Sequence, residues 1–302
     1  MNIQSKITRC ALVLALCGGA GPVLSQSAPA DALGRAWNEY GLQAFANADE
    51  LFAEVMQSDQ ATQEERWQAQ LGRAFITHYQ MPGRDPAAAI PQYQALLEQV
   101  GQRGLWRGQL LGRLADCHME ITPAQVDRAR ELYEQALSAL PADSPLVQET
   151  MLRLLSSYLQ RPDRDEIARG LQVAAEMTPR FAGTPFASVF YGMRAEMAFF
   201  IGDYPALANA LDAQYRAGIS NVRVKEAVLF RLARINEVEL GEYARAEGYY
   251  RLLASEVPSS QKAHFATLRA DELKEGKLDS DYAPPLSTPV EDQRAKEKPD
   301  GR

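Results

Sequence analysis

Six arginines recur along the chain at nearly constant spacing, and they are the side chains best suited to bind a ligand. They follow one another at intervals of 38, 40, 40, 41 and 40 residues: Arg35, Arg73, Arg113, Arg153, Arg194 and Arg234. A guanidinium group holds several N–H donors in a planar fork that matches the two oxygens of a carboxylate. This set, named here the arginine ladder, therefore predicts binding of carboxylates on a peptide, at a free C-terminus or on an acidic glycan.

A structural role for the same arginines competes with ligand binding. Asp116 and Glu237 each lie three residues after a ladder arginine, and Glu39 lies four residues after another. Oppositely charged side chains at these spacings are neighbours on a helix and pair readily. The sequence leaves both interpretations open, and the two roles can coexist.

The remaining polar residues do not form a recognisable catalytic or metal-binding pattern. His78 and His118 each lie five residues after a ladder arginine, with Cys117 beside the second histidine. Two histidines without an acidic or third histidine partner fall short of the usual zinc set, so partly buried, stacked rings are the favoured interpretation. The chain also lacks Gly-x-Ser-x-Gly, a phosphate loop and His-Glu-x-x-His. We expect no enzyme activity, no catalytic residue, no metal and no cofactor.

The spacing of apolar residues predicts helices that carry the ladder, most clearly between Leu232 and Pro258. Small and apolar residues recur at helical spacing in the first half of this stretch, and Gly241 marks a turn. A second apolar face follows, and Pro258 ends it. The stretch is therefore predicted to be one helical hairpin.

The same pattern recurs through most of the chain. Leu-Gly-Arg occurs at residues 33–35, 71–73 and 111–113, with looser copies around the other ladder arginines. The predicted second helices share an alanine followed four residues later by an aromatic residue: Ala48 and Phe52, Ala89 and Tyr93, Ala129 and Tyr133, Ala246 and Tyr250. Prolines that stop helices keep the same period, at Pro141, Pro179 and Pro258. About six hairpins are expected between residues 31 and 260.

This order of small residue, glycine, tyrosine, alanine, aromatic residue and proline resembles the tetratricopeptide (TPR) repeat family. The resemblance implies an all-α, right-handed α-solenoid of about six hairpins with a C-terminal capping helix. It also implies that the ladder position faces a concave groove that holds extended peptides, and that the protein is a non-enzymatic scaffold or adaptor for a protein partner. The lysine and asparagine of the family's best-known peptide clamp have no counterpart here. The alternative is a binder of anionic polysaccharide or peptidoglycan that supports glycan export or cell-wall assembly.

The N-terminus has the order of a secretory signal peptide, predicted over residues 1–30. Lys6 and Arg9 precede an apolar run, and small residues follow it. Cleavage after Ala30 is expected, with cleavage after Ser25 as a rival, so the mature chain is predicted to be periplasmic or secreted. The segment before Cys17 resembles a bacterial lipoprotein box, so the alternative is an envelope lipoprotein anchored through Cys17. The membrane is an expected partner only in that case.

The amino-acid composition bears on which partners the protein can bind and on what stabilises its fold. Without the predicted signal peptide, 30 basic and 39 acidic residues give a net charge of −9, which argues against nucleic acid because phosphate binding needs a basic surface. A lone Cys117 in the mature chain excludes an internal disulfide, so stability is expected to come from helix packing.

A single TPR-like domain is predicted over residues 31–274. A disordered tail, rich in proline and charge, is predicted over residues 275–302.

Overall fold

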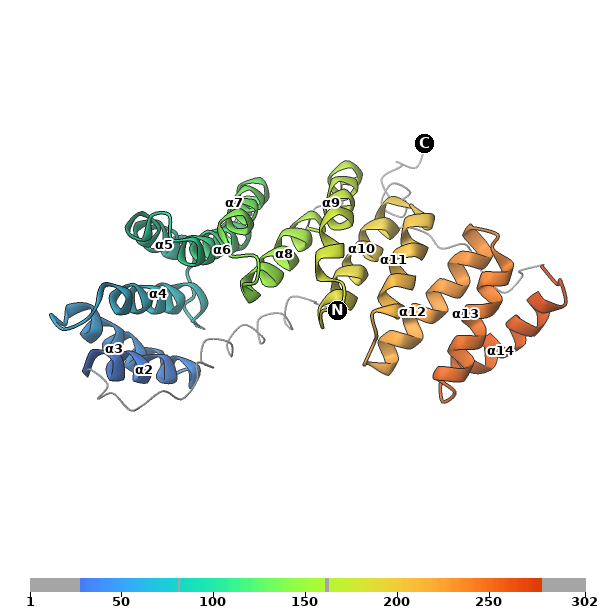
Figure 1. The fold of residues 1–302 in the computed structure, drawn as a ribbon, viewed down its shortest axis with the longest axis horizontal. Coiled ribbons are helices and arrows are strands. Elements are labelled where there is room, and N and C mark those ends of the chain that lie inside the picture. Colours follow the sequence, from blue (N-terminus) through green and yellow to red (C-terminus); the bar gives the residue numbers. More distant parts are fainter. Residues whose placement is uncertain (1–27, 81, 161–162, 279–302) are drawn as a thin grey trace, which may run out of the picture. The chain divides into compact units, whose positions relative to one another are not determined.

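The computed structural model describes residues 28–80, 82–160 and 163–278 (Figure 1). These residues form thirteen α-helices and no strand, which confirms the all-α prediction for the described part of the chain. Most of the predicted signal peptide, Cys17, and residues 279–302 of the predicted tail lie outside the described residues. Among the described helices, none is long and apolar enough to cross a membrane.

The domain predicted over residues 31–274 is divided into two compact units, with the division after Ser144. Unit 1 contains six helices: α2 (Ala28–Gly41), α3 (Phe45–Gln57), α4 (Gln63–Tyr79), α5 (Pro86–Val100), α6 (Gly104–Glu120) and α7 (Val126–Ala139). Within this unit each helix packs against the next one along the chain, and α2 also packs against α4. The unit is therefore built from three successive helical hairpins.

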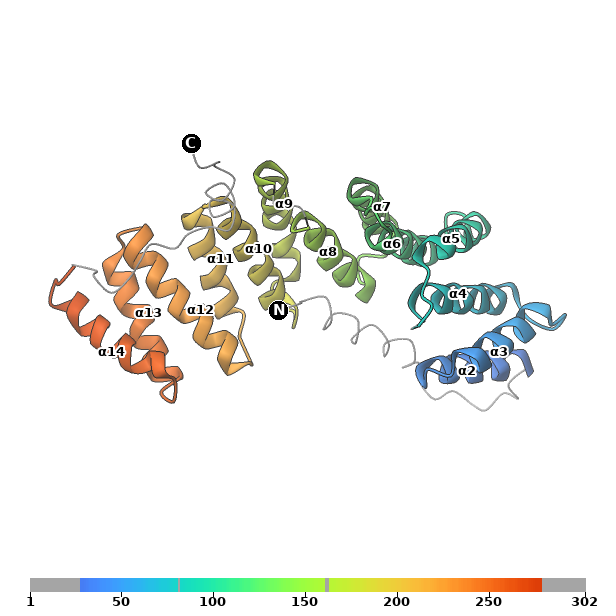
Figure 2. The ribbon, with the colours of Figure 1, turned by 180° about the vertical axis from the view of Figure 1, so that it is seen from behind.

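Unit 2 contains seven α-helices: α8 (Pro145–Tyr158), α9 (Arg164–Met177), α10 (Ala187–Ile201), α11 (Tyr204–Arg216), α12 (Val222–Arg234), α13 (Tyr243–Glu256) and α14 (Gln261–Lys274). A 3₁₀ helix (Thr178–Phe181) follows α9, and a π-helical turn, η2 (Ile235–Glu239), extends α12. Consecutive helices are again in contact. Seen from both sides, α10 to α14 lie side by side in chain order (Figures 1 and 2).

Local sequence signals set the ends of several helices. Thr62 and Glu65 form a capping box at the start of α4, and Asp85 caps α5. Gly202 ends α10 with φ of 72°, a left-handed conformation that glycine adopts without strain, and Asp203 then caps α11. Gly202 and Asp203 therefore form the tight turn between α10 and α11.

The small-then-aromatic pairs of the second helices fill the interior of the hairpins. Ala48 and Phe52 of α3 are fully buried, as are Ala246 and Tyr250 of α13. Gly72 of the Leu-Gly-Arg motif allows α3 and α4 to pack closely, because a Cβ at this position would lie 2.3 Å from the Phe52 ring. The motif glycine is needed here because an aromatic ring occupies the space of its missing side chain.

The last helix, α14, buries one face, which is mostly apolar and also holds Arg269. Ala263, Ala266, Ala270 and Leu273 of α14 are buried. Gln261, His264, Asp271 and Lys274 are exposed on the other side. The helix packs on α13, so it covers apolar surface while presenting polar groups to solvent.

Candidate functional site: the arginine ladder

The ladder arginines all lie on alternate helices. Arg35, Arg73 and Arg113 belong to α2, α4 and α6 of unit 1, and the other three belong to α8, α10 and α12 of unit 2. Each of these is the first helix of a predicted hairpin. The sequence period therefore places the six side chains on equivalent elements, although their surroundings differ.

The first two ladder arginines bind carboxylates while remaining partly exposed. Arg35 Nε lies 3.5 Å from Asp31 Oδ2, one turn earlier on α2. Arg73 donates from Nε and Nη2 to the two carboxylate oxygens of Asp49 on α3, at 2.8 and 3.3 Å. The second pair has the parallel two-bond geometry that arginine favours, and it joins the first hairpin to the second.

Arg113 is a buried part of a polar network rather than a surface group. Its Nη1 donates to Asp116 Oδ2 at 3.1 Å, and its guanidinium lies 5.5 Å from the centre of the Phe75 ring. Asp116 also accepts hydrogen bonds from Tyr133 at 2.7 Å and from Tyr79 at 3.3 Å. The predicted pairing between Arg113 and Asp116 is therefore present, and the cluster joins α4, α6 and α7.

In unit 2, Arg153 pairs with an acidic side chain one turn earlier, and Arg234 is buried. Arg153 donates from Nε and Nη2 to Glu149 Oε1 at 3.2 and 2.8 Å. Arg234 is buried, three residues before Glu237. Glu237 accepts from Tyr250 at 2.6 Å and from Arg269 Nε at 2.7 Å, partners that the helical spacing alone did not predict. Burial, together with the hydrogen bond that Tyr250 donates to Glu237, raises the pKa of Tyr250 well above its usual range.

Arg194 differs from the other members of the ladder. Its side chain is partly buried on α10. Its Nε is buried and has no hydrogen-bond partner among the described residues. Its neighbours one helical turn away are all uncharged: Phe190, Tyr191, Met197 and Ala198. No ion pair within the described chain neutralises this guanidinium.

The two histidines have different surroundings: His78 is buried, stacked and hydrogen-bonded, whereas His118 makes an exposed hydrogen bond. His78 is fully buried and stacks on Tyr79, with 3.9 Å between ring centres. Its Nδ1 lies 3.2 Å from Tyr93 Oη. His118 Nδ1 lies 2.8 Å from Gln125 Oε1. Within residues 28–80, 82–160 and 163–278, no group of three or more His, Cys, Asp or Glu side chains is placed to hold a metal.

Cys117 lies against His78, with its Sγ 3.6 Å from both ring nitrogens. The thiol is fully buried. Burial raises its pKa well above the usual value, and the nearby Asp116 and Glu120 charges act in the same direction. The thiol is therefore an inert packing group rather than a nucleophile.

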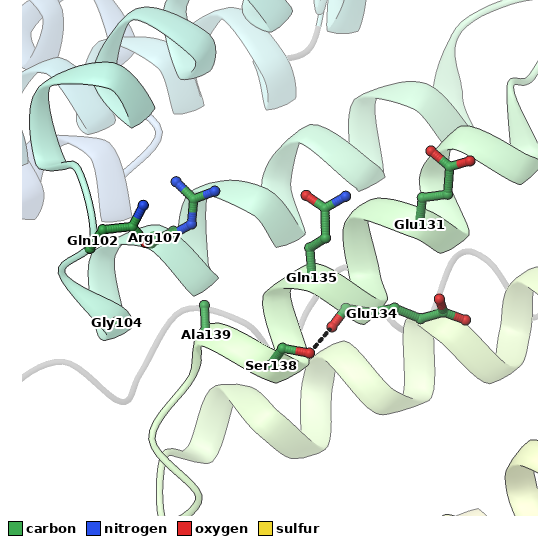
Figure 3. Close-up of a pocket in the computed structure, with 8 residues that line it drawn as sticks. All are labelled: Gln102, Gly104, Arg107, Glu131, Glu134, Gln135, Ser138 and Ala139. Carbon is green, nitrogen blue, oxygen red and sulfur yellow. Dashed lines mark hydrogen bonds between the residues drawn. The ribbon is translucent and has the colours of Figure 1, made fainter.

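A shallow open groove of about 730 Å³ lies between α6 and α7, apart from the ladder (Figure 3). Its walls are mostly polar: Gln102, Gly104, Arg107, Glu131, Glu134, Gln135, Ser138 and Ala139. Arg107 lies near one end, and Glu131 and Glu134 come from α7 (Figure 3). The groove lacks an apolar floor and convergent polar groups, which are typical of small-molecule sites.

Known proteins do not identify this site. The chain matches no protein-family model, and no curated protein shows significant sequence similarity to it. The functional argument therefore depends on the residues and contacts described above.

Proposed function

We propose that this protein is a TPR-like α-solenoid that acts as a non-enzymatic scaffold or adaptor and binds a protein partner along a concave groove. In this proposal each unit is a right-handed stack of three hairpins, and α14 is the capping helix of the second. The proposal includes no cofactor, no metal and no nucleic acid.

The observation that best supports the proposal is that helices of two kinds alternate along much of the chain. The first kind carries a ladder arginine on α2, α4, α6, α8, α10 and α12. The second kind, seen in α3, α5, α7 and α13, carries the fully or almost fully buried alanine and aromatic pair. Such an alternation is typical of a stacked array of hairpins, because successive hairpins then pack through equivalent helices.

The alternative, a binder of anionic polysaccharide or peptidoglycan, has less support from the geometry. A polyanion is best bound by a row of uncompensated positive charges. Four ladder arginines instead contact carboxylates of the same chain, through Asp31, Asp49, Asp116 and Glu149. A protein partner that contacts selected positions is the better fit.

We further propose that the protein is exported to the periplasm or secreted. Helix α2 begins at Ala28, so cleavage after Ser25 would keep the whole helix, whereas cleavage after Ala30 would remove its first three residues. The intact mass of the chain expressed in a bacterium with a C-terminal tag distinguishes these two products. A lipid-modified Cys17 would be detected as an added acyl mass and as fractionation with membranes. An unprocessed cytoplasmic chain would refute export.

The adaptor proposal is tested by capturing a partner and then reconstituting the complex. The tagged full chain is recovered from a bacterial envelope extract, and any co-purified protein is produced separately and titrated by calorimetry at about 0.1 and 0.5 M salt. An unrelated periplasmic protein with the same tag is the control. Saturable binding of one purified protein at both salt concentrations supports the proposal. Recovery of polysaccharide alone, or of no component with saturable binding, refutes it.

A further inference from the structure

We propose that Arg194 is the ladder residue that binds the partner, and that it does so through a carboxylate in an acidic peptide segment. The inference rests on the proposed adaptor function and names the contact within that surface. Two observations support it: the other ladder arginines are held in contacts within the chain or buried, and the residues one helical turn from Arg194 on α10 are uncharged.

The other five ladder arginines are engaged in structural contacts. Four have a carboxylate within 4 Å: Arg35 with Asp31, Arg73 with Asp49, Arg113 with Asp116, and Arg153 with Glu149. Arg234 is buried at the end of α12, three residues before the buried Glu237. A ligand carboxylate at any of the four paired positions would have to compete with an acceptor that is already held in place, and burial keeps a ligand from Arg234.

Arg194 has no such competitor because of the sequence around it. The residues one turn before and after it on α10 carry no charge. The preceding helix, α9, also has no carboxylate at the position equivalent to Asp49. Arg73 takes Asp49 from the preceding helix, 24 residues earlier, whereas the residue 24 positions before Arg194 is Gly170. No ion pair within the described part of the chain therefore competes for Arg194.

The unsatisfied Nε strengthens this assignment. A buried N–H without an acceptor raises the energy of the free state, because the group has lost water and gained no replacement. A carboxylate that draws the guanidinium outward would accept from both Nε and a terminal nitrogen. Binding would then remove an existing cost in the free protein. A neutral amide offers only one acceptor oxygen, so the site should prefer an acidic side chain.

The neighbouring helix α8 adds no competing ladder arginine. Helix α8 packs against α10, and adjacent helix axes lie about 8–10 Å apart. Arg153 of α8 is already paired with Glu149, whereas Arg194 of α10 has no hydrogen-bond partner for its Nε among the described residues. Tyr191, one turn earlier on the same helix, is also partly buried.

The test uses a fluorescein-labelled peptide of repeated Gly-Ser-Glu, a counterpart of repeated Gly-Ser-Gln, and fluorescence anisotropy. Arg194→Gln should weaken binding of the acidic peptide about tenfold or more, since one charge-assisted hydrogen-bonded contact is lost. Arg35→Gln is the matched control: it removes an exposed ladder arginine that already has a partner, and it should change the affinity less than about twofold. The amide peptide should bind the native protein at least about tenfold more weakly than the acidic one.

A stability measurement separates binding from folding. Arg194→Gln should unfold at a temperature no lower than that of native protein, because the variant removes a buried Nε that has no acceptor among the described residues. Equal binding by native protein and Arg194→Gln, equal affinity for the two peptides, or no binding of the acidic peptide would overturn the inference. If the partner captured above binds Arg194→Gln as tightly as native protein, the adaptor proposal stands and only the role of Arg194 falls.

Discussion

The contact between Arg269 and Glu237 should be among the most important interactions for the stability of unit 2. Arg269 of α14 donates from Nε to Glu237 of η2 at 2.7 Å, and both side chains are only 3% exposed. Arg269 also donates to Glu272 at 2.6 Å, and Glu237 accepts from Tyr250 at 2.6 Å. This network ties the last helix to the end of α12. Removing the arginine would leave a buried carboxylate with one hydrogen-bond donor and without its positive partner.

We expect Arg269→Met to destabilise unit 2 by about 3–5 kcal/mol, the usual cost of leaving one member of a buried ion pair uncompensated. For a unit of this size the unfolding temperature should fall by roughly 10 °C. Arg251→Met is the matched control, since Arg251 also links α13 to α14, through Asp271 at 3.1 Å, but its side chain is 43% exposed. An exposed pair contributes at most about 1 kcal/mol.

The tryptophans make the two units distinguishable in this experiment. All three lie in unit 1, at Trp37, Trp67 and Trp106, so tryptophan fluorescence follows that unit while circular dichroism at 222 nm follows the helices of both. Arg269→Met should shift the dichroism transition more than the fluorescence transition. A second variant that also carries Glu237→Leu should recover part of the loss, because the buried charge is gone. A loss no greater than that of Arg251→Met would refute the reasoning.

Two further predictions concern packing and pH. Gly72→Ala should destabilise unit 1 by about 1–3 kcal/mol, because the new methyl group would overlap the Phe52 ring; Gly34→Ala, with no atom within 4 Å of its new Cβ, should instead be neutral or stabilising by up to about 1 kcal/mol. Thermal unfolding followed by tryptophan fluorescence checks both, and equal effects would contradict the packing argument. Glu256 accepts hydrogen bonds from Tyr215 and from a lysine of α12, and these bonds lower its pKa. The contribution of the Glu256 carboxylate to stability should therefore be present above about pH 4.5 and be lost as the pH falls through the lowered pKa. Urea unfolding from pH 7 to pH 3 checks this: the difference in free energy of unfolding between native protein and Glu256→Gln should shrink in acid. A difference that stays constant with pH would contradict the prediction.

The repeated local features of the fold could be predicted from the sequence, because they depend on spacing along a helix. The arginine period placed every ladder residue on an equivalent helix, and the alanine and aromatic pairs identified much of the interior. The pairing of Arg113 with Asp116 also followed from helical spacing.

Contacts between distant segments could not be predicted in the same way. Arg73 pairs with Asp49, and Glu237 pairs with Arg269, 32 residues later. Both depend on how neighbouring helices pack, which a single sequence does not specify. The π-helical turn over η2 was also missed, because apolar spacing does not distinguish an i+5 turn from an ordinary one. The lack of a partner for Arg194 became clear only when the packing around it was known.

The network around Asp116 has a consequence for how unit 1 opens. Its carboxylate accepts from groups on α4, α6 and α7, so it joins the second hairpin to both helices of the third. Opening either hairpin alone would leave a buried carboxylate short of donors. The two hairpins should therefore exchange their backbone amide hydrogens with deuterium as a single cooperative group, with similar protection on α4, α6 and α7.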